Sequence, residues 1–223
     1  MILNYQSEKP KFVIFDGLDN TGKSTLISKV KKHFDATINT DLIHFPSNEL
    51  VKKYFNSEKQ IRNQRKEFVD ELFLEVEKYY NNKVRSGSIF FIDRFAISTL
   101  LFQGDPENID DEMNSYIDGK YIDFFCKYNI SIYEDVLFFI FMNQFPKQDR
   151  EITEKNKEIF DNKIEFYKKK LLTLYSNIIF DKYSCLFSDN TFDCSFTLDD
   201  IDLTQKIREK LIVDKISSYF SLM

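Results

Sequence analysis

The sequence predicts an α/β fold in which a roughly five-stranded parallel sheet is flanked by helices on both faces. Two observations support this class: short, fully apolar runs of the kind found in buried parallel strands, and longer stretches of helical spacing that separate them. The chain has 223 residues, of which 43% are hydrophobic and 30% charged. It shows no internal repeat and no linker rich in Gly, Ser or Pro, so we expect a single domain over residues 1–223.

The expected strands are the apolar runs Phe12–Phe15, Leu42–Phe45, Ile89–Ile92 and Val136–Met142. A weaker fifth run lies near Ser184–Phe187 or at Phe192–Phe196. The expected helices begin at Lys23 or cover about Asn63–Arg85, Asp110–Tyr128, Thr153–Asn177 and Leu198–Phe220. Ligands of a parallel sheet bind beyond the carboxyl ends of its strands, so we expect the chemistry to follow the ends of the first four runs.

The bulk composition indicates a cytoplasmic protein that binds neither nucleic acid nor membrane. The net charge is −5, without the basic excess of a nucleic-acid-binding surface. Its three cysteines are odd in number and have no metal-like spacing, which favours free thiols in a reducing compartment. No apolar segment approaches the roughly 20 residues of a membrane span, and the start, MILNYQSEKPK, does not resemble a signal peptide.

The stretch GLDNTGKS, residues 17–24, fits the phosphate-binding pattern G-x-x-x-x-G-K-[ST] in full, between an expected strand and an expected helix. Glycines let successive backbone N–H groups curl toward one phosphate, and the helix presents its positive end to the same anion. Lys23 would reach the β- and γ-phosphates, and the Ser24 hydroxyl would ligate Mg²⁺. The residues expected to bind the nucleotide are Gly17, Asn20, Thr21, Gly22, Lys23, Ser24 and Thr25.

A second constellation follows the strand expected at Ile89–Ile92. Asp93 stands at its carboxyl end, where a second carboxylate of a magnesium site is required, although it could instead cap the next helix. Arg94 comes next and could grip a second phosphoryl group with two parallel hydrogen bonds, or form an ordinary surface ion pair. The adjacency of the two residues favours the phosphate-binding interpretation.

The segments FDGLDNTGKST, HFPSNELVKKYF and IDRFAISTLLFQG, in this order and spacing, resemble thymidylate kinase, a family of nucleoside-monophosphate kinases. The resemblance covers roughly residues 11 to 180, and the D-R-F…S…F-Q-G string is its most specific part. It implies a P-loop kinase fold with a short lid at about residues 143–155, and a homodimer. It also implies ATP- and Mg²⁺-dependent phosphoryl transfer to a deoxynucleoside monophosphate, with dTMP to dTDP as the leading reaction.

The resemblance implies a set of acceptor-binding residues: Asp19, Phe45, Pro46, Phe73, Arg94, Ser98, Phe102 and Gln103. In the family pattern Asp19 approaches the sugar 3′-hydroxyl, and Arg94 grips the acceptor phosphate. Phe73 matches the aromatic residue that stacks on the base. Asp19 could instead stabilise its own loop, and Phe73 could simply be a core residue, because it falls on a helical apolar stripe.

The lid is the expected source of a catalytic arginine. Some family members carry this arginine in the phosphate loop, but Asn20 occupies that position here. Arg150 is the one arginine of the segment NQFPKQDREITEKNKEIF, so the resemblance assigns it the role, with Lys147 and Lys155 as lesser candidates. A lid of this kind closes over the phosphates, excludes water and supplies positive charge. With Lys23 and Arg94, Arg150 completes the expected catalytic set.

Two positions depart from the family pattern. Asn48 stands where an arginine usually contacts the acceptor phosphate, and Glu77 where an arginine usually donates to the base. A carboxylate at that second position would favour a base with an amino group. Either the alignment is shifted at this point, or the acceptor differs from dTMP.

Other functions stay open on the sequence alone. Asp16 could serve as the base of a deoxynucleoside kinase, whose acceptor is a hydroxyl. A nucleotide-dependent switch is a second alternative, although the guanine-binding motif N-K-x-D is not found after any expected strand. An inactive nucleotide-binding scaffold is the third.

Overall fold

The computed structural model describes residues 9–17, 23–54, 64–83, 85, 87–95, 111–131, 134–141 and 201–222. This part of the chain forms a four-stranded, wholly parallel sheet in the order β2-β3-β1-β4. The strands are β1 (Lys11–Gly17), β2 (Thr40–His44), β3 (Ile89–Asp93) and β4 (Val136–Phe141). Each agrees with an expected run to within one or two residues at either end, so the α/β prediction is confirmed.

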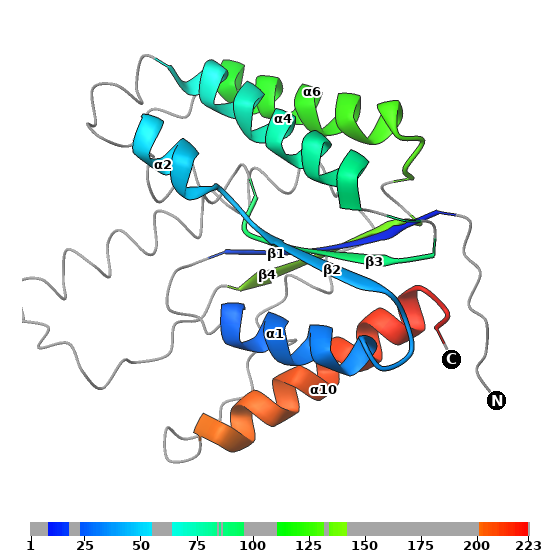
Figure 1. The fold of residues 1–223 in the computed structure, drawn as a ribbon. Coiled ribbons are helices and arrows are strands. Elements are labelled where there is room, and N and C mark those ends of the chain that lie inside the picture. The colour runs from blue at the N-terminus through cyan, green and yellow to red at the C-terminus, as the bar shows by residue number, and fades with distance from the viewer. Residues whose placement is uncertain are drawn as a thin grey trace, which may run out of the picture.

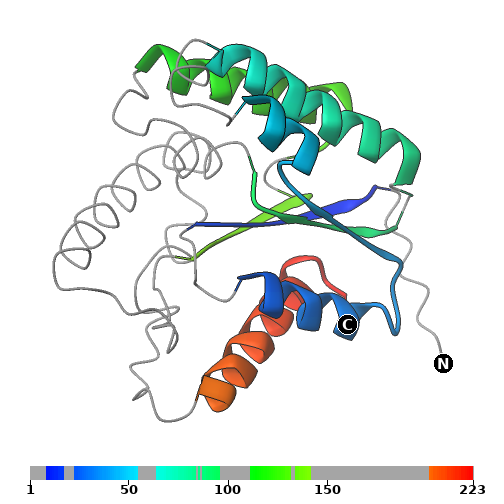
Figure 2. The same cartoon turned by 60° about the vertical axis from the view of Figure 1, so that its left-hand side comes forward.

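Helices cover both faces of this sheet, as Figures 1 and 2 show. On one face lie α1 (Lys23–Phe34) and α10 (Ile201–Tyr219), which contact each other. On the other face lie α2 (Asn48–Tyr54), α4 (Arg65–Lys83) and α6 (Asp111–Lys127). The expected helix Thr153–Asn177 and the weak fifth strand fall outside the described residues.

Helix α2 was not expected from the sequence, and Ser47 explains why the chain turns into a helix there. The Ser47 hydroxyl accepts a hydrogen bond from the backbone N–H of Leu50 at 3.2 Å, as an N-cap does. Leu50 and Tyr54, one turn apart, are both buried. Phe45, expected in a strand, instead follows the end of β2 and joins Pro46 through a cis peptide bond.

The sheet is buried on both sides, which explains its uninterrupted apolar runs. All five residues of β3 are buried, and Phe12 of β1 is fully inaccessible to solvent. The Phe12 ring lies edge-on to Phe90 of β3 at 5.4 Å and stacks on Tyr80 of α4 at 5.8 Å. Such aromatic contacts add to the burial of apolar area and hold helix and sheet in one arrangement.

The strand register brings the carboxyl ends of three strands to one edge of the sheet. Phe15 of β1 and His44 of β2 are both registered with Asp93 of β3. Backbone hydrogen bonds extend this pairing past the strands, from Phe45 N–H to the Asp93 carbonyl at 3.0 Å and from Arg94 N–H to the Phe15 carbonyl at 2.9 Å. This edge is where the sequence predicts the chemistry.

The opposite, amino-terminal edge carries a partly buried ion pair. The Lys11 ammonium lies 2.6 Å from Asp135 Oδ1, and these side chains are only 14% and 4% exposed. Asp135 Oδ2 also accepts a hydrogen bond from the Ser131 N–H at 2.9 Å. The Lys11 ammonium lies 5.6 Å from the centre of the Phe220 ring, which links the end of the C-terminal helix to the same corner.

Across the described residues, no helix is both long and apolar enough to cross a membrane.

We predict that Asp135→Ala lowers the free energy of unfolding by about 2 kcal/mol, because the partly buried Lys11 loses its counter-ion and the Ser131 N–H loses its acceptor. Urea denaturation monitored by circular dichroism measures the change. Glu134→Ala is the matched control, since Glu134 is exposed and Lys11 contacts only its backbone carbonyl. Equal stabilities for the two variants would contradict the assigned role of the pair.

Candidate active site

Asp93 lies at the centre of the site, at the carboxyl end of β3. Its side chain is 6% exposed, and its Oδ2 accepts a hydrogen bond from the Ser24 hydroxyl at 2.8 Å. His44 Nδ1 lies 3.0 Å from the same oxygen. The other oxygen, Oδ1, is buried and has no hydrogen-bond partner among the described residues. Asp93 therefore faces the start of α1, with one carboxylate oxygen held and the other still able to accept.

The environment of Asp93 keeps its carboxyl group ionised. Burial raises the pKa of Asp93, but hydrogen bonds from His44 and Ser24 lower it. Electrostatic interactions with His44 and Lys23 lower it further, so that the net pKa of Asp93 is below the ordinary value of an aspartate. A carboxylate that stays charged at neutral pH despite its burial is suited to binding a cation.

Helix α1 presents the second part of the site. Lys23, its first residue, is buried at 5% exposure, whereas Ser24 and Thr25 are exposed. The first turn contains no acidic residue, and the last contains Lys31, Lys32 and His33, so the charges along α1 complement its dipole. Its amino end is therefore an electropositive surface for an anion. Gly17 ends β1 six positions before Lys23, and the residues between them, including Asp19, Asn20, Thr21 and Gly22, lie outside the described residues.

Arg94 follows Asp93 in an unusual backbone conformation. Its φ is 67°, in the left-handed region that residues other than glycine rarely adopt. The hydrogen bond from its N–H to the Phe15 carbonyl holds the chain in this turn at the end of β1. Such strain is typical of functional sites, where the surrounding structure holds a residue in a costly conformation. The half-buried Arg94 is thus placed by backbone geometry at the same edge as Ser24 and Asp93.

An aromatic cluster supports this edge from the side of α4 and α6. Phe95 packs against Phe45 at 6.0 Å, Phe73 at 5.2 Å and Tyr121 at 4.8 Å between ring centres. The expected acceptor residues Phe45 and Phe73 thus share one neighbour, located two residues after Asp93. Both are buried, at 1% and 5% exposure, so each also belongs to the core.

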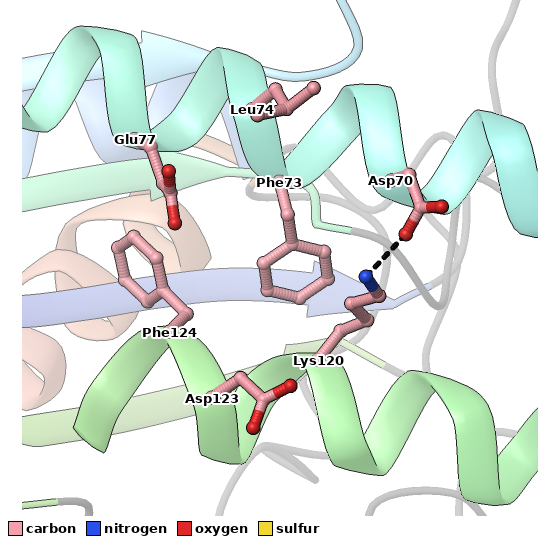
Figure 3. A pocket seen from close by; sticks show the side chains of 7 residues that line it. All are labelled: Asp70, Phe73, Leu74, Glu77, Lys120, Asp123 and Phe124. Atoms are coloured by element: carbon pink, nitrogen blue, oxygen red, sulfur yellow. Dashed lines mark ion pairs between the residues drawn. The ribbon is translucent and has the colours of Figure 1, made fainter. Parts of the chain in front are cut away.

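A groove of about 420 Å³ lies between α4 and α6, and Figure 3 shows its side chains. Phe73 and Phe124 point into the space between the helices, and an ion pair of 2.5 Å joins Asp70 to Lys120 across it. None of Ser24, Asp93 and Arg94 lines this groove. It is therefore a separate feature from the site around Asp93.

Glu77 belongs to the groove. Its carboxylate accepts a hydrogen bond from the Lys127 ammonium of α6 at 2.8 Å and is only 22% exposed. In the family pattern this position holds an arginine that binds the base. Here it holds Glu77, whose carboxylate forms an ion pair with the neighbouring helix. Asn48, the other departure, is the first residue of α2, directly after the N-cap Ser47.

Two residues of the site were missed by sequence reasoning. His44 contacts Asp93, and Glu75 of α4 accepts hydrogen bonds from both the hydroxyl and the N–H of Ser47, at 2.5 and 3.4 Å. Glu75 thereby ties the segment after Pro46 to α4. The position of His44 directly before Phe-Pro, at the end of an expected strand, was the signal that could have identified it. Ser98, Phe102, Gln103 and Arg150 lie outside the described residues.

The arrangement of sheet and site defines the class of protein. A parallel sheet in the order β2-β3-β1-β4, with helices on both faces and α1 following the inner strand β1, is the arrangement of a P-loop kinase fold. Comparison with known proteins narrows this class.

The sequence model of the family described as thymidylate kinase matches residues 15–182, and the chain belongs to this family. It is 28% identical over 182 residues to the thymidylate kinase of Leptospira borgpetersenii serovar Hardjo-bovis (strain L550), covering 77% of this chain and 82% of the relative. The crystal structure of thymidylate kinase from Ehrlichia chaffeensis has a TM-score of 0.51 at 19% identity and covers 76% of this chain and 90% of that one. The thymidylate kinase structure from Candida albicans has a TM-score of 0.41 at 16% identity, covering 93% of both chains.

The protein is therefore a nucleoside-monophosphate kinase whose reaction is the phosphorylation of dTMP to dTDP, with a nucleotide as phosphate donor. The parallel sheet and the P-loop kinase fold agree with this family.

We predict that Arg94→Gly is more stable than Arg94→Ala by about 0.5–1 kcal/mol, because glycine adopts a φ of 67° without the steric cost that alanine carries. Both variants lack the guanidinium group, so their difference isolates the backbone term. Thermal and urea denaturation of the pair measure it. A more stable alanine variant would show that the left-handed turn is not strained.

Proposed function

We propose that the donor is ATP with Mg²⁺, that its phosphates bind at the amino end of α1, and that the phosphate of dTMP binds beside Arg94. The hydrogen bond of 2.8 Å between Ser24 and Asp93 carries this proposal. It joins the helix that would bind the donor phosphates to the strand end that bears Arg94. Donor and acceptor phosphates would therefore meet at one edge of the sheet.

The residues at this edge fit a magnesium ion. The Ser24 hydroxyl donates its hydrogen to Asp93, so its oxygen lone pairs are free to accept a cation. Asp93 Oδ1 is a buried oxygen with no hydrogen-bond partner in the described residues, and such atoms call for an unobserved ligand. Mg²⁺ commonly binds through one or two protein oxygens together with substrate phosphates and water. When bound, it neutralises negative charge on the phosphates of the donor.

Positively charged side chains would neutralise the remaining negative charge on the phosphates. Phosphoryl transfer to a phosphate needs alignment and charge neutralisation, because the acceptor is already an anionic nucleophile. Lys23, buried at the start of α1, would bind the β- and γ-phosphates where low dielectric strengthens its field. Arg94 would hold the acceptor phosphate with two parallel hydrogen bonds. Arg150, in the lid at about residues 143–155 of a single domain, is proposed as the third cation.

The thymine nucleotide is proposed to bind on the side of Phe45 and Pro46. Phe73 supports this side through Phe95, and Asp19, Ser98, Phe102 and Gln103 would complete the contacts to sugar and base. Glu77 lines the groove between α4 and α6 and pairs with Lys127 there, so the proposal does not assign its carboxylate to the choice of a base with an amino group.

A hydroxyl acceptor is less well supported than a phosphate. Asp16, the candidate base for such an acceptor, is fully buried within β1. A base must come within hydrogen-bonding distance of the hydroxyl that it deprotonates, and the Asp16 carboxylate does not reach the surface at which such a hydroxyl would arrive. Homodimer formation and a cytoplasmic location are further parts of the proposal, based on the family resemblance and on composition.

A coupled assay with ATP and Mg²⁺ tests the proposal against dTMP, dUMP, dCMP, dGMP, dAMP, the ribonucleotides and thymidine. We expect turnover with dTMP. Phosphorylation of thymidine but not dTMP would indicate a deoxynucleoside kinase. Hydrolysis of ATP that does not depend on a monophosphate would indicate a switch, and binding without turnover would indicate a scaffold.

We predict that Lys23→Ala lowers kcat by at least about 100-fold, because one preorganised charge at the transferring group is commonly worth that much. Lys32→Ala, an exposed lysine at the other end of α1, is the matched control and should keep the parent rate. Steady-state kinetics and thermal melting distinguish loss of chemistry from loss of fold. A folded Lys23→Ala variant with near-parental kcat would refute the role of Lys23.

A further inference from the structure

We infer that His44 is a positioning residue for the cation site: it holds the carboxylate of Asp93 so that Oδ2 carries hydrogen bonds and Oδ1 is left for the metal. The inference rests on the proposed magnesium site at Ser24 and Asp93. It concerns the orientation of the carboxylate rather than direct contact of His44 with substrate or metal.

The sheet itself places His44 beside Asp93. The two residues are registered partners at the ends of the parallel strands β2 and β3, so their side chains leave the sheet on the same side. The hydrogen bond from Phe45 N–H to the Asp93 carbonyl continues this register by one more residue. The contact at 3.0 Å between His44 Nδ1 and Asp93 Oδ2 is therefore built into the backbone pairing.

Both observed donors act on one oxygen of the carboxylate. Because Asp93 is ionised and accepts only, the ring of His44 must carry a hydrogen on Nδ1 to make its contact. A single hydrogen bond from Ser24 would leave the carboxylate free to turn about its Cβ–Cγ bond. His44 supplies a second donor to the same oxygen and restricts that rotation. The two donors are fixed independently, because Ser24 belongs to α1 and His44 to β2.

The restricted rotation of the Asp93 carboxylate affects its other oxygen, Oδ1. Asp93 Oδ1 is buried and has no hydrogen-bond partner among the described residues, an arrangement that costs free energy in the absence of a ligand. If the carboxylate rotated, Oδ1 could take one of the two donors and would no longer be available to the cation. His44, 57% exposed at the rim, is well placed to prevent this without entering the site. Residues that orient metal-binding groups in this way commonly change metal affinity 10- to 100-fold when removed.

The test measures ATP affinity by isothermal titration calorimetry at stepped Mg²⁺ concentrations and again in EDTA, using the full chain. The test variant is His44→Phe, which keeps a ring but lacks a donor, with His44→Ala as a second removal in case the larger ring disturbs the site. His44→Asn is the rescue variant, because its amide nitrogen can donate from the position of Nδ1. His33→Ala, which removes the other, exposed histidine on α1, is the matched control.

We expect His44→Phe and His44→Ala to raise the half-saturating Mg²⁺ concentration about 10-fold, with ATP affinity in EDTA and the melting temperature unchanged. His44→Asn should stay within about 3-fold of the parent, as a retained donor requires, and His33→Ala should match the parent. The inference would be overturned if removal of His44 left the Mg²⁺ requirement unchanged, or if His44→Asn raised it as much as His44→Phe. It would also be overturned if the removals weakened ATP binding in EDTA as much as in Mg²⁺.

Asp93→Ala separates this inference from the proposed function. If Asp93→Ala raises the Mg²⁺ requirement and both removals of His44 do not, the magnesium site stands and the role of His44 is wrong. If Asp93→Ala itself has no effect on the Mg²⁺ requirement, the proposed magnesium site fails, and the inference about His44 fails with it.

Discussion

The hydrogen bond between Ser24 and Asp93 is the contact on which the site depends. It joins the first turn of α1 to the end of β3, two segments that lie 69 residues apart in the chain. Because β1 pairs with β3 directly, the chain that leaves β1 enters α1 on the same edge at which β3 ends. Without this adjacency, the hydroxyl and the carboxylate would be two unrelated surface groups. With it, the proposed cation and the phosphates that it accompanies would have one common place to bind.

The aromatic core gives this edge its electrostatic character. Lys23 and Asp93 are both nearly inaccessible to solvent, among strands built largely of Phe, Ile and Val. Burial of a single charge is expensive, but opposite charges and hydrogen bonds offset the cost, as the lowered pKa of Asp93 shows. The same low dielectric makes each charge act more strongly on a bound phosphate than it would at the surface. The phenylalanine-rich core would thus favour the proposed binding of phosphates, even though the net charge of the chain is −5.

Local patterns predicted most of what the structure shows. The phosphate-binding pattern, the strand before it and Asp93 after an apolar run are all signals carried by a few neighbouring residues, and the fold brings Ser24 of this pattern into contact with Asp93. His44 could not be found in that way, because its contact depends on the register between β2 and β3 across 49 residues. Helix α2 was missed because it is short and its formation depends on a single capping residue.

Glu77 shows a different limit of sequence reasoning. Spacing along α4 correctly put it one turn after Phe73, but spacing does not say what a neighbouring helix offers. Lys127 of α6 forms an ion pair with Glu77. The sequence alone does not predict this contact, so it suggested a base-binding role for Glu77 instead. The periodicity of apolar residues therefore predicts the fold of the kinase. The partner of an individual polar side chain, in contrast, depends on elements that are distant in sequence.

The ion pairs between α4 and α6 also select how the two helices lie along each other. Lys66 pairs with Glu112 at the beginning of the two helices, while the polarity is reversed further along, where Asp70 pairs with Lys120. The helices run parallel, and a slip of one turn would bring Asp70 opposite Glu112, so that repulsion would replace attraction. Each pair is individually weak at the surface, yet the change of polarity between the first pair and the two that follow, Asp70–Lys120 and Glu77–Lys127, discriminates against misaligned packing in a way that one repeated polarity could not. The order of charges therefore favours one alignment of α4 and α6, in addition to the packing of their side chains.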